Sequence, residues 1–149
     1  LAAVGRNKAG PERDLFEMYA RRLAPPGLAV REVEEKRPLP SAQMMAREAA
    51  LLLAALPPGA VVVALDERGA QLDSPAFAAR LGAWRDAGTA DLAFVVGGAD
   101  GQGEPVRARA DLLLSLGRMT WPHMLVRGLL AEQLWRAQAI LAGHPYHRV

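Results

Sequence analysis

The sequence predicts an α/β fold built on one parallel β-sheet with helices on both faces. Five short apolar segments of strand length alternate along the chain with five segments of helical periodicity, and this alternation is typical of parallel sheets. Neither a linker nor an internal repeat divides the 149 residues, so we expect a single domain that covers residues 1–149. A chain of this length buries roughly two-thirds of its unfolded surface, which is enough for a real core.

The predicted strands are short apolar runs bounded by polar or turn-forming residues. They lie at Leu1–Val4, Leu28–Val33, Val61–Leu65 and Leu92–Val96, and a short fifth piece is expected near Arg118–Thr120. Ligands of open α/β sheets bind at the carboxyl ends of the strands. The loops that follow these strands are therefore the first candidates for a binding site.

The first three helices have recognisable starts or ends. The first carries Leu15, Phe16, Tyr19 and Leu23 at helical spacing, and the run Pro25-Pro26-Gly27 ends it. The two that follow are recognised by their caps, which we describe next.

Ser41 is expected to cap the second helix, which ends before Pro57. Ser74 followed by Pro75 predicts a cap and a first-turn proline for the third helix, with Gly88 at its exit. Both starts place a hydroxyl where the first backbone N–H groups of a helix need an acceptor.

The fourth helix is expected from about Pro105 to Leu116, and the fifth begins near Met124. Gly143 is expected to end the fifth helix, because glycine readily adopts the left-handed conformation of a helix exit. The fifth helix has a broad apolar face, formed by Val126, Leu129, Leu130, Leu134, Ala137, Ile140 and Leu141.

The composition is that of a globular protein, with 51% hydrophobic and 23% charged residues. The longest apolar runs, such as Ala49–Leu56, are too short to span a bilayer, and the start of the chain does not look like an export signal. The chain has no cysteine, which excludes disulfides, thiolate catalysis and cysteine-ligated zinc. We therefore expect a cytoplasmic protein without membrane association.

The formal net charge of +2 does not by itself indicate a nucleic-acid partner. Of the 18 cationic side chains, however, only Lys8 and Lys36 are lysines, so 16 are arginines. Arginine suits planar recognition of phosphate and stacking on bases, although a coding bias produces the same excess.

Three loops at predicted strand ends are candidates for binding. The first places Leu65 at the carboxyl end of a strand, before the polar turn Asp66–Gly69. The second, Val96–Gly103, has the order G-G-x-x-G-x-G, which is neither the Rossmann fingerprint nor a phosphate-binding P-loop. Its glycines allow a sharp turn and a close approach to a ligand. The third, Ser115–His123, offers backbone groups that suit the edge of an adenine.

The C-terminal tail, defined as the residues after Gly143, concentrates reactive side chains. It contains His144, Tyr146, His147 and Arg148, with Pro145 favouring an extended conformation of its neighbour. Imidazole, phenol and guanidinium groups together can move a proton, stack on a base and bind phosphate. A metal site on His144 and His147 is poorly supported, since no third ligand is nearby and a proline interrupts the pair.

These loops and this tail, taken in order, resemble the RlmH-type 23S rRNA pseudouridine N3-methyltransferases of the SPOUT class. The similarity runs over essentially the whole chain. The residues that carry it are Ala3-Val4-Gly5, Ala64-Leu65-Asp66, Val96–Gly101, Met119–His123, Leu125–Ala137 and His144–Arg148. Gln102 departs from the family pattern, because a hydrophobic residue is expected there, and it leaves the closure of the glycine loop open.

The resemblance implies a SPOUT-type parallel sheet with a C-terminal deep trefoil knot, and an obligate homodimer. It also implies S-adenosyl-L-methionine as cofactor, held by Leu65, Gly97 and the stretch Leu116, Gly117, Arg118, Met119, Thr120 and Trp121. The implied catalytic and substrate-side residues are His144, Tyr146, His147 and Arg148, with His123 as a further match. The implied partner is 23S rRNA within the ribosome, and no metal is required.

In the reaction that the resemblance implies, N3 of a pseudouridine must lose its proton, and a neutral histidine is a suitable acceptor. We expect His144 or His147 to take the proton, Tyr146 to contact the base and Arg148 to bind phosphate. In the implied dimer the tail of one subunit faces the cofactor of the other, and Arg127 and Arg136 are expected at the margins of an interface on the last helix.

Two other functions remain open from the sequence. The first is a SPOUT-like methyltransferase that acts on tRNA or another RNA. The second is a non-catalytic nucleotide- or RNA-binding α/β module, which would bind RNA without transferring a methyl group and without high affinity for S-adenosylmethionine.

Overall fold

The structure, a computed structural model, describes residues 1–147 and forms two compact units. The first unit comprises Leu1–Arg6, Ala29–Gln71 and Asp91–His123. It contains all five strands. The second comprises Asn7–Leu28, Leu72–Ala90 and the chain from Met124 onward, and it is helical.

The sheet of the first unit is parallel throughout and has the strand order β2-β1-β4-β3-β5. The expected α/β architecture with a parallel sheet is therefore confirmed. The strands are β1 (Ala2–Val4), β2 (Arg31–Val33), β3 (Val61–Gln71), β4 (Leu92–Val96) and β5 (Leu112–Ser115).

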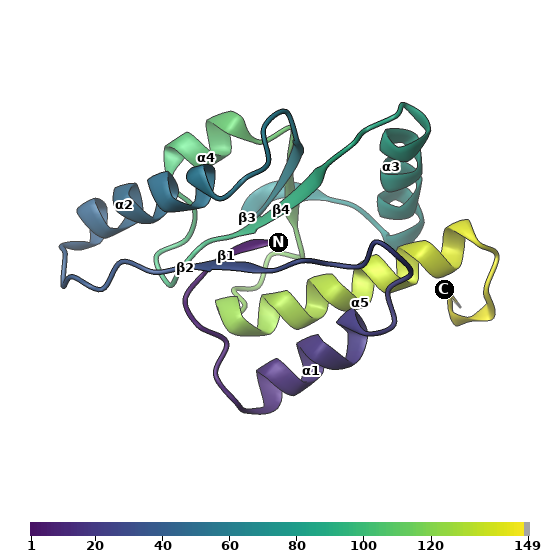
Figure 1. Ribbon diagram of the computed structural model, residues 1–149, viewed down its shortest axis with the longest axis horizontal. Helices are drawn as coiled ribbons and strands as arrows, with labels where there is room; N and C mark the ends of the chain where they lie inside the picture. The colour runs from purple at the N-terminus through teal and green to yellow at the C-terminus, as the bar shows by residue number, and fades with distance from the viewer. Residues whose placement is uncertain (148–149) are drawn as a thin grey trace. The chain divides into compact units, whose positions relative to one another are not determined.

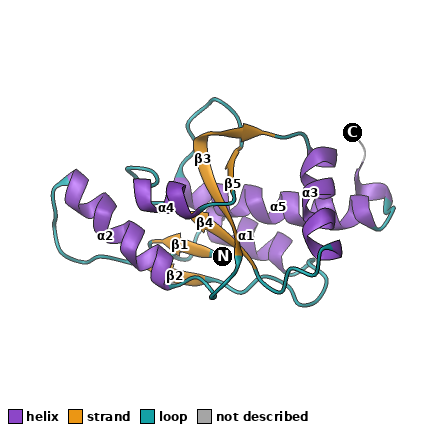
Figure 2. Cartoon of the chain, turned by 90° about the horizontal axis from the view of Figure 1, so that it is seen from above, coloured by secondary structure: helices purple, strands orange, loops and turns teal. Residues whose placement is uncertain are grey.

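The pairing of β3 with β5 is interrupted and then resumes. β3 pairs with β5 up to Leu65 opposite Leu114, and the register then shifts so that Ala70 also lies opposite Leu114. Figure 2 shows the long β3 with β5 beside it. Gly69 rejoins so closely that a Cβ there would lie 2.5 Å from the carbonyl carbon of Leu113, so only glycine fits. The residues between Leu65 and Ala70 therefore form an arch at the end of the strand.

Two helices of the first unit, α2 (Ser41–Ala54) and α4 (Glu104–Arg109), pack together and against the strands. Figure 1 shows both on one face of the sheet. Their buried side chains form one core cluster with alternate residues of the strands. The members that fill its centre are Ala49, Leu52, Val62, Ala64, Val95 and Val106. The intervening residues Val63 and Phe94 are buried as well.

The second unit contains α1 (Pro11–Ala20), α3 (Ser74–Asp86), α5 (His123–Leu141, which starts in the first unit) and the short 3₁₀ helix η1 (Pro145–His147). Helix α5 is central to it. Gly128 lies against Leu15 of α1, and the Ser74 hydroxyl donates to Gln133 across 2.7 Å. Gly143 ends the helix region with a φ of 71°, as the sequence predicts.

Two predicted elements are wrong. The fourth helix ends at Arg109 instead of continuing to Leu116, and Leu112–Ser115 is the fifth strand. Asp111 causes the change: its N–H donates to the Val62 carbonyl, and its carboxylate accepts from the Val62 N–H, both across 2.8 Å. These bonds attach the chain to β3, so the apolar run that follows extends the sheet. Arg118–Thr120 is consequently a loop.

Smaller differences concern strand and helix starts. β2 begins at Arg31 instead of Leu28. Ser41 is the first residue of α2 and makes no capping bond, and the cap of α3 is Asp73, whose carboxylate accepts from the Ala76 N–H. Asp73 takes the role expected of Ser74, because it is Asp73 that occupies the N-cap position, from which a side-chain oxygen reaches the N–H groups of the first turn.

Candidate functional site

The candidate cofactor residues lie where the pairing of β3 with β4 ends and in the loops that directly follow β4 and β5. Leu65 on β3 lies opposite Val96 on β4 and opposite Leu114 on β5. Gly97 directly follows β4, and Leu116 directly follows β5. We call this region, formed by Leu65, Gly97 and Leu116–Trp121, the strand-end edge. The sheet register brings together what the sequence lists as three separate loops.

The glycine loop after β4 folds back on itself. The Gly101 N–H donates to the Gly98 carbonyl across 3.0 Å, and a Cβ on Gly97 would lie 2.7 Å from the Gly101 carbonyl oxygen. A real Cβ does not approach a backbone oxygen so closely, so Gly97 must be glycine for the loop to close. Gly97 and Gly98 are buried in this turn, and Ala99 and Asp100 at its tip are exposed.

A buried ion pair follows Leu65. The Asp66 side chain is 2% exposed and accepts from the Arg68 N–H at 2.8 Å and from Arg107 Nε at 2.7 Å. Pairing and hydrogen bonding compensate for the burial of this charge. Asp66 therefore fixes the direction of the chain at the edge and ties it to α4. Sequence reasoning assigned no role to Arg107, and only its helical position near the glycine loop hinted at one.

Gln102, where a hydrophobic residue was expected, also ties the edge together. Its side-chain nitrogen donates to the carbonyls of Leu65 and Val95, each at 3.1 Å. The side chain of Gln102 thus connects the loop after β4 to backbone carbonyls of β3 and β4.

The third loop is shaped by Ser115. Its hydroxyl donates to the Gly117 carbonyl at 2.8 Å and accepts from the Gly117 N–H at 3.2 Å, and Gly117 has a φ of 121°. Beyond this turn, Arg118–Trp121 is exposed, with Met119 exposed by 77% and Trp121 by 41%. Two large apolar side chains at a strand-end edge are suited to contact a ligand or a partner.

Glu48 of α2 lies against the glycine loop. A Cβ on Gly98 would lie 2.8 Å from its carboxylate, so the carboxyl group packs on the loop backbone. Burial, and then the negative charge of Asp100, raise the pKa of Glu48. A carboxyl group in this position is neutralised more readily than a solvated one.

The tail is held on α5 by Tyr146. Its ring lies 3.7 Å from that of Trp135, between centroids, and its hydroxyl donates to Glu132 across 3.0 Å. Arg136 also binds Glu132, and its guanidinium lies 4.8 Å from the centre of the Tyr146 ring. Burial raises the pKa of Tyr146 to about 12, and hydrogen bonds to Glu132 and Tyr19 add to the shift. The phenol therefore stays protonated and serves as an anchor.

The other tail residues have different surroundings. His144 is exposed, its N–H donates to the Ala139 carbonyl, and its Nδ1 accepts from the Tyr146 N–H at 3.2 Å. His147 ends η1, but its side chain lies outside what the structure describes, as does Arg148. His123 is partly buried at the start of α5. Arg127, expected at a margin of α5, is buried.

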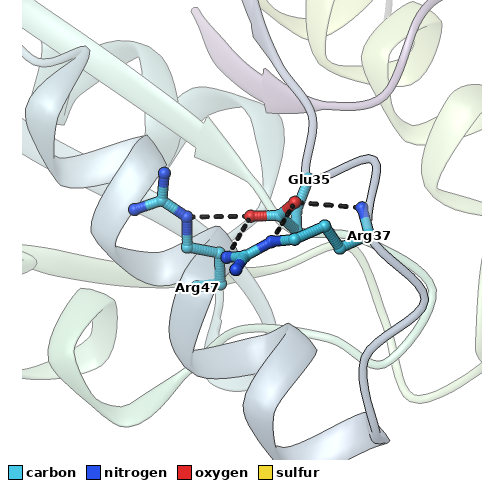
Figure 3. A network of polar contacts seen from close by, with 3 residues as sticks. All are labelled: Glu35, Arg37 and Arg47. Atoms are coloured by element: carbon cyan, nitrogen blue, oxygen red, sulfur yellow. Dashed lines mark hydrogen bonds and ion pairs between the residues drawn. The ribbon is translucent and has the colours of Figure 1, made fainter.

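A charged network occupies the surface of the first unit between β2 and α2. Figure 3 shows Glu35 between Arg37 and Arg47. The carboxylate accepts from the Arg37 backbone and side chain and from Arg47 Nε at 2.9 Å. Hydrogen bonds from Arg37, followed by those from Arg47, lower the pKa of Glu35 to about 2. The network fixes the segment that leads from β2 into α2.

The strand-end edge is chemically compatible with a ligand that contains a nucleoside. Its glycines allow a close approach to the backbone, and the charge of Asp66 is already paired with Arg107. Among residues 1–147, no group of three or more His, Cys, Asp or Glu side chains is arranged to hold a metal ion. Over the same residues, no helix has the length and apolar character to cross a membrane.

Comparisons with known proteins identify the family of the chain. A family model described as "Predicted SPOUT methyltransferase" matches residues 1–147. A protein of Paramagnetospirillum magneticum named ribosomal RNA large subunit methyltransferase H is 68% identical over 148 residues, which cover 99% of this chain and 97% of that protein. Proteins with the same name from Rhodospirillum centenum and Rhodospirillum rubrum are 65% and 62% identical over the same shares of both chains.

Proposed function

The chain belongs to the SPOUT methyltransferase family, and we propose that it methylates N3 of a pseudouridine in 23S ribosomal RNA, on the assembled ribosome, with S-adenosyl-L-methionine as methyl donor. The observation that carries the proposal is the register of β4, β3 and β5. It places Leu65, Gly97 and the loop after Ser115 side by side at the carboxyl ends of the strands. Close relatives named as large-subunit rRNA methyltransferases support the substrate class.

The cofactor contacts in this proposal are backbone groups of Leu65, Gly97 and Leu116–Trp121. When bound, S-adenosylmethionine supplies an electrophilic methyl group on a positively charged sulfur. The strand-end edge then has to match the shape of the cofactor more than its charge, because the positive charge on the sulfur disappears when the methyl group is transferred. The paired state of Asp66 and the closed glycine loop agree with that requirement.

The tail contributes proton transfer and substrate binding in this proposal. The proton of N3 goes to the imidazole of His144 or His147, because a neutral imidazole nitrogen accepts a proton. Tyr146 holds both on α5 through Glu132 and Trp135, and Arg148 binds an RNA phosphate. His123 acts at the entrance of α5, beside the exposed loop. The proposal includes the deep trefoil knot of the family and a homodimer in which one subunit's tail serves the other's strand-end edge.

The substrate is tested by incubating the protein with labelled S-adenosylmethionine and, in parallel, whole ribosomes, free 23S rRNA and tRNA. We expect one methyl group per ribosome, located on a pseudouridine by mass spectrometry of digested RNA. Transfer to tRNA alone would replace the substrate in the proposal. RNA binding without transfer and without affinity for the cofactor would instead identify a non-catalytic module.

The composite dimer is tested by mixing two inactive variants. One carries Gly97→Ala and lacks a usable strand-end edge, and the other lacks the tail but keeps its edge. If edge and tail come from different subunits, co-expression restores activity to about a quarter to a half of wild type, because the mixed dimer has one complete site. If both come from the same subunit, the mixture stays inactive.

The proton acceptor is identified from the variants His144→Ala and His147→Ala. Loss of a general base typically costs a factor of about 10² to 10⁴ in rate. If one variant loses this factor together with the acid limb of its pH–rate profile, the histidine that it replaces is the base. An unchanged rate removes the substituted residue from the mechanism.

A further inference from the structure

Gln102 is a buried polar residue beside the glycine loop, at a position where a hydrophobic residue was expected. Its side chain is 2% exposed and lies directly after the turn formed by Gly98 and Gly101. The expected hydrophobic residue would fill the same space without placing an amide out of water. A buried amide lowers stability unless its hydrogen bonds are made.

The orientation of the amide follows from its neighbours. Leu65 and Val95 both offer carbonyl oxygens at 3.1 Å, so the nitrogen must face them and donate both of its hydrogens. Oε1 then points to the glycine loop, where a Cβ on Gly97 would lie 3.2 Å from it. Within residues 1–147, this buried oxygen has no hydrogen-bond partner. The amide is therefore half satisfied, and stability alone does not account for it.

The two bonded carbonyls belong to neighbouring strands at the point where their ladder ends. Leu65 opposite Val96 is the last pair between β3 and β4, and β3 changes register directly afterwards. The nitrogen of Gln102 bridges a carbonyl of β3 and a carbonyl of β4, so one side chain connects the two strands where their pairing ends. Without the amide, this connection between the strands is lost.

We propose that Gln102 is a positioning residue for the cofactor: it holds the Leu65 carbonyl, the end of β4 and Gly97 at a fixed spacing, so that the edge is preorganised for the nucleoside part of the methyl donor. This inference rests on the proposed function. It assigns the departure from the family pattern a role, because an aliphatic side chain would fill the space but leave the two carbonyls free to move.

The main test measures binding of S-adenosylhomocysteine by calorimetry in Gln102→Met, which keeps the length of the side chain and removes the amide. We expect the Kd to rise about tenfold, which corresponds to the loss of about one net hydrogen bond. In methylation assays, the KM for the cofactor should rise similarly while kcat falls less than about threefold. A Kd within about twofold of wild type, in a protein with a native circular dichroism spectrum, overturns the inference.

Gln138→Met is the matched control. Gln138 accepts a bond from the Ala24 N–H at 2.9 Å within the second unit, so the same chemical change removes a side chain–backbone bond that does not involve the residues of the strand-end edge. Its cofactor affinity should stay within about twofold of wild type. An equal loss of affinity in both variants would indicate a general effect on stability and would contradict a positioning role.

Gln102→Glu supplies a second measurement, the pH dependence of cofactor affinity, which a purely structural role would not change. A carboxylate faces the two carbonyls without a proton to donate, whereas the protonated acid donates to one of them. Affinity of this variant should therefore improve as the pH falls from 8 to 5, unlike that of wild type. A pH-independent ratio of the two affinities contradicts the inference.

Two results separate the inference from the function on which it depends. If the wild-type protein neither binds S-adenosylhomocysteine nor transfers methyl groups, the proposed function is wrong. If wild type does both and Gln102→Met matches it, only the role of Gln102 fails. Should both variants unfold, the side-chain amide signals of Gln102 in wild type are followed by NMR: they should shift on binding, unlike those of Gln138, and unchanged signals overturn the inference.

Discussion

The strand-end edge and the C-terminal tail are held in place by different kinds of contact. The edge depends on pairings between strands far apart in the sequence, such as Leu65 with Val96 and with Leu114. The tail depends on Tyr146 and on a helix only 14 residues earlier, at Glu132. A surface fixed by sheet register is rigid, whereas one anchored by a single ring can be released locally. We therefore expect the edge to set cofactor affinity and the tail to set the rate of transfer.

Removing Gly143–Val149 tests this division most severely. Transfer to ribosomes should fall by more than about 10³-fold, because the proton acceptors are lost with the tail. The Kd for S-adenosylhomocysteine should stay within about threefold of wild type, since the edge is intact. Calorimetry and a ribosome methylation assay on the same preparation check this. A parallel loss of cofactor binding would mean that the two regions are not separable.

Gly97→Ala should impair the strand-end edge and leave the tail intact. The new Cβ would lie 2.7 Å from a backbone oxygen of Gly101, so the glycine loop must open. We expect cofactor affinity to fall by about 10²-fold or more. Gly82→Ala is the control, because the Cβ there meets only the movable end of the Leu141 side chain at 3.1 Å. Equal affinities in the two variants would show that loop closure is not needed.

Tyr146→Phe should loosen the tail without touching the edge. The ring can still pack on Trp135, but the bond to Glu132 is lost, and such bonds contribute about 1 kcal/mol. We expect kcat to fall about fivefold at constant KM for the cofactor, as measured by steady-state methylation. Since the pKa of Tyr146 is raised to about 12, the wild-type phenol stays protonated, and the ratio of the two rates should not change between pH 6 and 9. A pH-dependent ratio would make Tyr146 a proton carrier instead.

Ser115→Ala addresses the third loop of the edge. It removes both bonds between the hydroxyl and Gly117, so the turn into Leu116 loses its constraint. The Kd for S-adenosylhomocysteine should rise about threefold to tenfold. Ser41→Ala is the control, because Ser41 makes no capping bond. If both variants bind equally well, the shape of this turn does not matter for binding.

The sequence predicted those parts of the strand-end edge whose structure is determined by residues close together in the chain. The bounds of β4, Leu92–Val96, are those expected, because a buried apolar run is followed at once by glycines. β5 was missed because Leu112–Ser115 has no periodicity that separates strand from helix, and Asp111 decides it through bonds to Val62 on another strand.

The same distinction explains what was missed in the candidate site. Loop positions after strands were recognisable from the chain, so the positions of Leu65 and Gly97 next to each other in the sheet could be expected. Arg107 and Gln102 act through contacts 41 and 37 residues away, to Asp66 and to the Leu65 carbonyl. No pattern within a short window carries such information, since the contact exists only after the sheet has formed.

The smallest expected effects are changes in the free energy of unfolding. They have opposite signs at two carboxyl groups: Glu35, in the segment before α2, and Glu48, in α2. The pKa of Glu35 is about 2 in the folded protein against an ordinary value of 4.5, so the stability it provides is present above pH 4.5 and is lost as the pH falls towards 2. Glu35→Gln should therefore be less stable than wild type at neutral pH and equal to it near pH 2. Because the group is on the surface, the difference should be small.

Glu48 should behave in the opposite sense. Its folded pKa is raised, so the wild-type protein loses stability as the pH rises above 4.5 through the raised value, because the folded state binds the proton more tightly than the unfolded state does. Glu48→Gln should therefore be more stable than wild type at pH 7, and the gain should vanish below about pH 4. Urea unfolding across this range measures both variants. A loss of stability at pH 7 in Glu48→Gln would mean that the carboxylate is favoured against the glycine loop, and the edge would then carry a negative charge.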